Sequence, residues 1–82
     1  MIVFQVNDEN GNGLSVIQHN VGSVEIFQVA GKEFAPLIIA ESVDSNGRIF
    51  WATMPEDPKR HRDAQLAGRA ISSYLKEQHV LL

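Results

Sequence analysis

The chain has 82 residues, of which 44% are hydrophobic and 21% are charged, and its net charge at pH 7 is −3. This length fits a single domain, residues 1–82, and the composition is that of a globular protein rather than a disordered or coiled-coil one. The sequence contains no cysteine, which excludes disulfides, thiol catalysis and cysteine-ligated metals. No run of residues approaches the ~20 apolar residues of a membrane span, and no basic, then apolar, secretion signal is present. We therefore predict a cytoplasmic protein without a membrane partner.

Three short segments have strand character in the first part of the chain. In the first, residues 2–6, a strand places Ile2, Phe4 and Val6 on one side and Gln5 on the other, and the second and third are residues 14–19 and 24–29. Glycine and asparagine lie between these segments, and both residue types tolerate the positive φ angles of tight turns. This pattern predicts three consecutive strands joined by turns.

The next part of the chain predicts a hairpin. Residues 34–43 and 48–53 are apolar runs, and Asn46-Gly47 lies between them. Asn-Gly flanked by apolar strands is the strongest short-range hairpin signal that a sequence contains. The prediction is therefore a sheet of about five strands.

The apolar periodicity changes from that of a strand to that of a helix after residue 54. Asp57 is a suitable N-cap and Pro58 suits a first helical position. The residues that then recur at helical spacing are Ala64, Ala67, Ile71, Tyr74 and Leu75. We predict one long C-terminal helix from about Pro58 to about Gln78. Strands followed by a helix indicate an α+β fold, an antiparallel sheet with the helix packed on one face.

The predicted hairpin is apolar on both of its faces. Phe50, Ala52 and Met54 point to one side of their strand, whereas Ile49 and Trp51 point to the other. One helix covers only one face, so something else must cover the second. Three alternatives remain open: a homodimer, curling of the sheet into a partial barrel, and a foreign partner. We favour the homodimer, because closed two-fold dimers are the commonest oligomers, and we give the curled sheet nearly equal weight.

A basic cluster occupies the expected first turn of the helix, where the helix dipole disfavours cations. Lys59, Arg60 and Arg62 form it, and Arg69 adds a further basic residue along the helix. Together with helix amides, such side chains can bind an anion, and Trp51 could add a stacking platform for a base. The alternative is a solvated basic turn that nearby acidic residues offset. A net charge of −3 disfavours a dedicated nucleic-acid binder.

The sequence shows no pattern typical of catalysis, metal binding or cofactor binding. His19, His61 and His79 lack the i, i+4 spacing of a helical metal site. The chain has no Gly-x-Ser-x-Gly elbow, phosphate loop or dinucleotide fingerprint. We therefore predict no metal site, no cofactor and no enzymatic activity.

Small residues in the predicted helix, above all Gly68, predict a close approach to another backbone or side chain. Close packing on the sheet is the simpler interpretation, and a helix from a partner chain crossing at Gly68 is the other.

These observations favour a small non-enzymatic protein-interaction module. Such a module would be an accessory, regulatory or inhibitory protein, a phage-encoded one included, that binds another protein through the sheet face and the basic helix start. A homodimer is the expected form. The alternative is a weak nucleic-acid or anion-binding domain that uses the basic helix N-terminus.

Overall fold

The computed structural model describes the backbone of residues 1–80 and the side chains of residues 1–78. Its five strands are β1 (Ile2–Asn7), β2 (Gly13–Val21), β3 (Val24–Gly31), β4 (Phe34–Val43) and β5 (Ile49–Thr53). A short 3-10 helix, η1 (Pro58–Arg60), leads into the α-helix α1 (His61–Val80). The predicted α+β fold is confirmed: an antiparallel sheet of five strands precedes one helix that packs against it.

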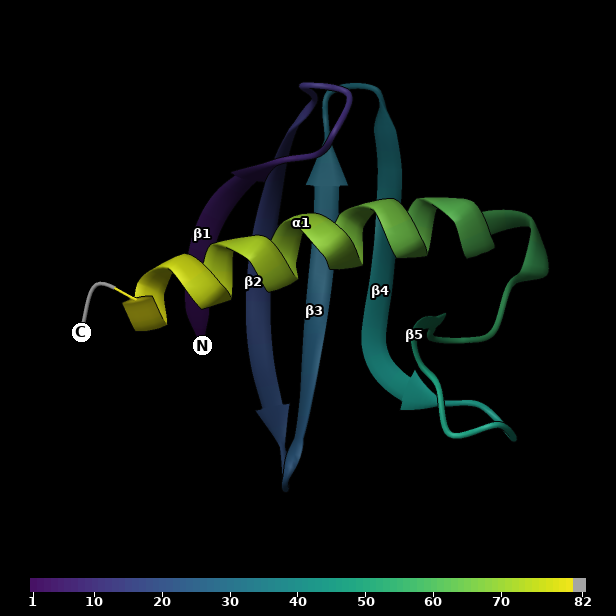
Figure 1. Cartoon of the computed structure of the whole chain (residues 1–82). Coiled ribbons are helices and arrows are strands. Elements are labelled where there is room, and N and C mark those ends of the chain that lie inside the picture. The colour runs from purple at the N-terminus through teal and green to yellow at the C-terminus, as the bar shows by residue number, and fades with distance from the viewer. Residues whose placement is uncertain (81–82) are drawn as a thin grey trace.

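The strands form a meander in which every neighbour in space is also a neighbour in sequence, in the order β1-β2-β3-β4-β5. All four pairs are antiparallel. The register is regular except for a bulge between β3 and β4, where the segment from Phe34 to Leu37 in β4 has one residue more than the segment from Val29 to Gly31 that it faces. Helix α1 runs across β1, β2, β3 and β4 on one side of the sheet (Figure 1).

Two of the hairpin turns are built in the same way. The turn of residues 8–12 is Asp-Glu-Asn-Gly-Asn and that of residues 44–48 is Asp-Ser-Asn-Gly-Arg. In both, the aspartate Oδ1 accepts hydrogen bonds of 2.9 Å from the amides two and four residues later. In both, the glycine has a positive φ, 83° at Gly11 and 78° at Gly47, which favours this residue type. The Asn-Gly hairpin at residues 46–47 is thus confirmed, and an aspartate at the first position anchors each turn.

The helix begins differently from the prediction in its first turn. Asp57 is the N-cap as predicted, and its side chain accepts a hydrogen bond from the amide of Lys59. The amide of Arg60 then bonds to the carbonyl of Asp57, an i, i+3 pattern that makes residues 58–60 a 3-10 turn. The α-helix therefore starts at His61 and continues to Val80, two residues beyond the predicted end.

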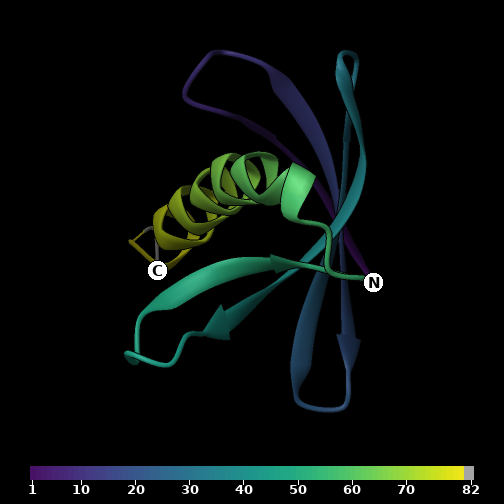
Figure 2. The same cartoon turned by 90° about the vertical axis from the view of Figure 1, so that its right-hand side faces the viewer.

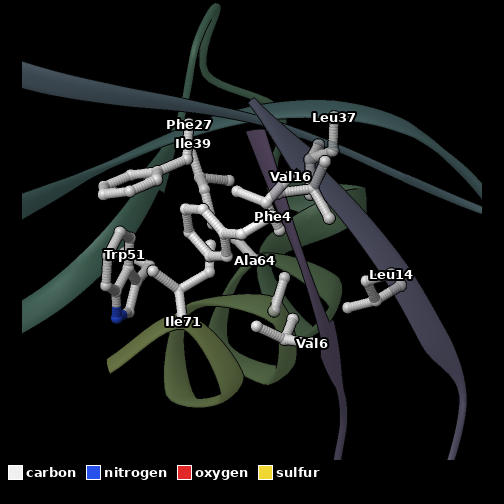
Figure 3. Close-up of a cluster of buried hydrophobic side chains, with 12 residues drawn as sticks. Phe4, Val6, Leu14, Val16, Phe27, Leu37, Ile39, Trp51, Ala64 and Ile71 are labelled. Carbon is white, nitrogen blue, oxygen red and sulfur yellow. The ribbon is translucent and has the colours of Figure 1, made fainter. Parts of the chain in front are cut away.

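The core lies between the sheet and α1, and Figure 3 shows its side chains converging. Leu14, Ile39 and Ile71 are at most 1% exposed, and they come from β2, β4 and the helix. The ring of Phe4 stacks on that of Tyr74 with centroids 4.4 Å apart. The predicted inward face of the helix, which includes Ala64, Ala67 and Ile71, is confirmed.

The sheet is curled, but the curl leaves one face open. The β4–β5 hairpin turns toward the side on which α1 lies, so that the sheet partly wraps the helix (Figure 2). No segment of the described chain forms a layer on the opposite face (Figure 2). Curling, one of the three alternatives for the two-sided hairpin, is therefore present. It explains the burial of Trp51 and Ile39 on the hairpin's inner side. On the outer side Ala40 is buried and Phe50 lies beside His61, whereas Ile38 and Met54 stay exposed.

Candidate interaction surface

The open face consists of the strand side chains that point away from α1. The pairing register places Val3 opposite Ile17, Ile17 opposite Gln28, and Gln28 opposite Ile38. These four residues form one row across four strands. Val3 is 63% exposed and Ile38 is 37% exposed, so the row is accessible to solvent. We call the outward strand residues the open face; the largest apolar ones are Val3, Ile17, Val21, Val24, Ile26, Ile38 and Phe50.

The charged side chains of the strands do not lie on the open face. In the described strands, the charged residues are Glu25 in β3 and Glu41 in β4. Glu41 is paired with Trp51 and Glu25 has the same strand parity as Phe27, so both belong to the side of the sheet that faces the helix. The open face of these strands therefore carries no Asp, Glu, Lys or Arg. Depletion of charge is the compositional mark of the centre of a protein interface.

The polar groups near the middle of the open face partly satisfy one another. The Nε2 atom of His19 and the Oε1 atom of Gln28 are hydrogen-bonded at 2.6 Å, between β2 and β3. A paired polar group costs less to remove from water than an unpaired one. This pair therefore lowers the cost of covering the face with another surface.

A hollow of about 600 Å3 lies on the open face beside the loop that joins β5 to η1. Ile17, Gln28 and Ile38 form part of its floor, and Met54 and Pro55 form part of its wall. The loop is tied back to the sheet by the amide of Met54, which donates to the carbonyl of Ile38 at 2.9 Å. The hollow is thus built on the same residues that form the uncharged row.

A second hollow, of about 620 Å3, borders the other end of the same loop. Its lining includes Phe50 and Ala52 from the open face of β5, and His61 from the start of α1. Glu56 and Asp57 line both hollows. The loop therefore adds acidic side chains at the margin of a face that is otherwise uncharged.

Arg60, one of the predicted anion-binding residues, is committed to contacts within the chain. Its Nε atom forms a 2.6 Å ion pair with Asp63, and one of its terminal nitrogens donates to the carbonyl of Ala35 at 2.8 Å. Its guanidinium carbon lies 5.4 Å from the centroid of the Phe34 ring. These contacts join the helix start to β4, so Arg60 has a structural role that its sequence position did not reveal.

The other predicted basic residues are dispersed. Arg69 forms a 2.6 Å ion pair with Glu9 of the β1–β2 turn. Lys59 and Arg62 are exposed at the helix start, and within the part of the chain that the structure describes neither forms an ion pair. The structure therefore leaves Lys59 and Arg62 available for an anionic partner and holds Arg60 and Arg69 in internal pairs.

Trp51 does not form the exposed stacking platform considered from the sequence. It is 7% exposed and belongs to the core, where its ring meets that of Phe27 edge-on at 5.6 Å. The reason is its parity in β5: residues 51 and 53 point toward the helix, whereas residues 50 and 52 point to the open face. A base cannot stack on a ring that is packed against α1.

Among the ionisable groups, Asp8 has a shifted pKa. Burial raises the pKa of this carboxyl, but hydrogen bonds from the amide and side chain of Asn12 and the amide of Asn10 outweigh it, and the net shift is downward. This group lies in a turn, where its role is structural.

The described residues contain no cluster of three metal-ligating side chains. None of the described helices is both long enough and apolar enough to cross a membrane.

The sequence predicted that the hairpin is apolar on both faces, but it did not predict the extent of the uncharged surface. The signal was present, because charges are concentrated in the turns and the helix while the strand segments hold only two glutamates. Which side of the sheet those glutamates occupy follows only from the register.

Comparison of the chain with protein-family models, with characterised proteins and with solved structures finds no match.

Proposed function

We propose that this chain is a cytoplasmic, non-enzymatic protein-interaction module that binds a partner protein through its open face. The observation that carries the proposal is the absence of charged side chains from the outward side of the described strands. A sheet face exposed to water normally carries charged as well as polar side chains, whereas this face carries polar ones, such as Gln5 and Gln28, and no charged ones. The exposed side chains of Val3, Ile38 and Met54 lose contact with water only when another surface covers them.

The alternative, binding of an anion or nucleic acid at the helix start, has less support. Arg60 and Arg69 are paired with carboxylates, and Trp51 is buried. Lys59 and Arg62 remain as a basic pair, and the acidic side chains of Glu56 and Asp57 lie just before them in the chain. A phosphate backbone would meet this mixture of charges with little net attraction.

Site-specific photo-crosslinking in the cell that makes the protein tests the proposal. A photoreactive side chain replaces Ile38 on the open face, and the control replaces Ile49, another exposed isoleucine of the same hairpin that points to the other side of the sheet. We expect protein adducts from position 38 well above the level at position 49. Equal adduct levels at the two positions would contradict the proposal.

A third position tests the alternative in the same experiment. The photoreactive residue at Arg62 reports on whatever contacts the basic helix start. Nuclease-sensitive adducts at position 62, with no protein adducts at position 38, would show that the chain binds nucleic acid instead.

A further inference from the structure

We infer that the partner on the open face is a second copy of this chain, related to the first by a two-fold axis. The inference rests on the proposed function and names its partner. It follows from three properties of the open face, which are its charge, its area and the position of its polar groups.

Charge favours a copy over a foreign surface with charges of its own. A charged side chain brought against Val3, Ile17 or Ile38 would lose water and find no opposite charge among the strand residues of the open face. In a two-fold dimer the same patch meets itself, so its composition must be self-complementary. An uncharged patch meets this requirement, because it brings no like charges together. The charged side chains of the strands lie on the side of the helix, and the charges nearest to the open face are those of Glu56 and Asp57, at its margin.

The area is large enough for a specific dimer. Because the β4–β5 hairpin turns toward the side of α1, the open face is best approximated by β1 to β4, which at about 4.8 Å between strands and about eight residues of about 3.4 Å each span about 19 by 27 Å. The flat area is about 520 Å2 on each copy, or about 1,000 Å2 for the two copies, before the relief of the side chains is added. A copy that covers the open face therefore reaches the size of about 1,000 Å2 at which specific interfaces begin.

The polar groups of the face are compatible with burial. His19 and Gln28 are hydrogen-bonded to each other at 2.6 Å within one copy. The hollow beside Met54 and Pro55 gives the face relief, and its lining also includes the charged side chains of Glu56, Asp57 and Arg60.

The mass of the protein in solution tests the inference directly. Light scattering on a sizing column at about 200 µM chain, well above the micromolar dissociation constants common for interfaces of this size, should give twice the 9.1 kDa chain mass. A mass of 9.1 kDa at this concentration overturns the dimer. Such a monomer, if position 38 still crosslinks a foreign protein in cells, leaves the proposed function standing; adducts between two copies of the chain support both.

Charged substitutions locate the interface. Ile38→Lys should weaken the dimer at least about 30-fold, because the added charge has no partner in the covered face. Ile49→Lys, at a residue that is 69% exposed on the other side of the sheet, should leave the dimer unchanged. Val3→Lys repeats the test at a residue that is 63% exposed, where the fold tolerates the change, and circular dichroism verifies that each variant is folded. Equal dimer affinity for the Ile38, Val3 and Ile49 variants would place the interface elsewhere and overturn the inference.

Discussion

Gly68 lies directly against the indole ring of Trp51. A Cβ atom built on Gly68 would come within 2.1 Å of the Cγ and Cδ1 atoms of that ring, whereas carbon atoms in contact are normally about 3.5–4.0 Å apart. The missing side chain therefore allows α1 to approach β5. A glycine in a helix interior costs about 1 kcal/mol relative to alanine, and this contact accounts for its presence. The close packing on the sheet predicted for Gly68 is confirmed, and no space remains there for a helix from a partner chain.

We expect Gly68→Ala to destabilise the protein although alanine is the better helix former. The gain in helix propensity is about 1 kcal/mol, and the displacement of the Trp51 ring, which is enclosed in the core, should cost about 1–3 kcal/mol more than that gain. Urea denaturation measures the difference. Ser73→Ala, at an exposed position of the same helix, is the control and should change the free energy of unfolding by no more than about 0.5 kcal/mol. A Gly68→Ala variant as stable as this control would show that the ring moves freely.

Gln65 protects the outer edge of the sheet by taking the place of a neighbouring strand. Strand β5 is an edge strand, and its Trp51 amide donates to the Oε1 atom of Gln65 at 3.0 Å. The Nε2 atom of Gln65 donates in turn to the Trp51 carbonyl at 2.6 Å. Gln65→Leu should therefore lower stability by about 1–3 kcal/mol and accelerate exchange of the Trp51 amide hydrogen.

The control for Gln65 separates the two hydrogen bonds. Gln65→Glu keeps an acceptor for the Trp51 amide and places a carboxylate oxygen against the Trp51 carbonyl. Protection of the amide should survive better in this variant than in Gln65→Leu. If neither substitution changes the exchange rate of the Trp51 amide hydrogen, the hydrogen bonds from Gln65 do not protect this amide.

Asp8 should make stability depend on pH in the acid range. Hydrogen bonds in the turn hold the pKa of this carboxyl below its ordinary value of 3.8, so folding favours its ionised form. The resulting stability is fully present well above pH 3.8 and is lost as the pH falls through the lower pKa of the folded state. Asp8→Asn should thus flatten the acid limb of the stability profile between about pH 5 and pH 2. Urea denaturation across this range tests it, and equal acid limbs for both proteins would refute the role of Asp8.

The basic residues at the helix start should respond to substitution in opposite directions. Lys59 and Arg62 are exposed, and the helix dipole disfavours their charge, so replacing both with glutamate should stabilise the helix start. Each substitution should raise the free energy of unfolding by about 0.3–1 kcal/mol, and repulsion from the neighbouring acidic residues should reduce this gain. Arg60→Ala should instead destabilise the fold, because it removes the contacts with Asp63, Ala35 and Phe34.

Thermal melting of these variants distinguishes the two roles. A stabilised Lys59/Arg62 double variant that still forms the same protein crosslinks from position 38 would remove the basic turn from the functional surface. Equal melting temperatures for Arg60→Ala and the wild-type protein would show that the Arg60 contacts contribute nothing.

Local signals in the sequence determined the elements and their order. The Asn-Gly turn, the Asp57 cap and the change of apolar period after residue 54 all act over a few residues, so the hairpin and the helix could be predicted without knowledge of the remainder. The parity of residues 48–54 also follows from strand geometry, which made it possible to predict that both faces of the hairpin are apolar.

Only the tertiary structure decided which side of each strand meets the helix, and with it the fate of the candidate site residues. Trp51 is buried because its side of β5 faces α1, and Arg60 is paired because β4 lies beside the helix start. The uncharged character of the open face depends on four pairing registers that bring residues from five separate segments onto one surface. Such a surface has no counterpart in any single stretch of sequence, because its residues become neighbours only when the strands pair.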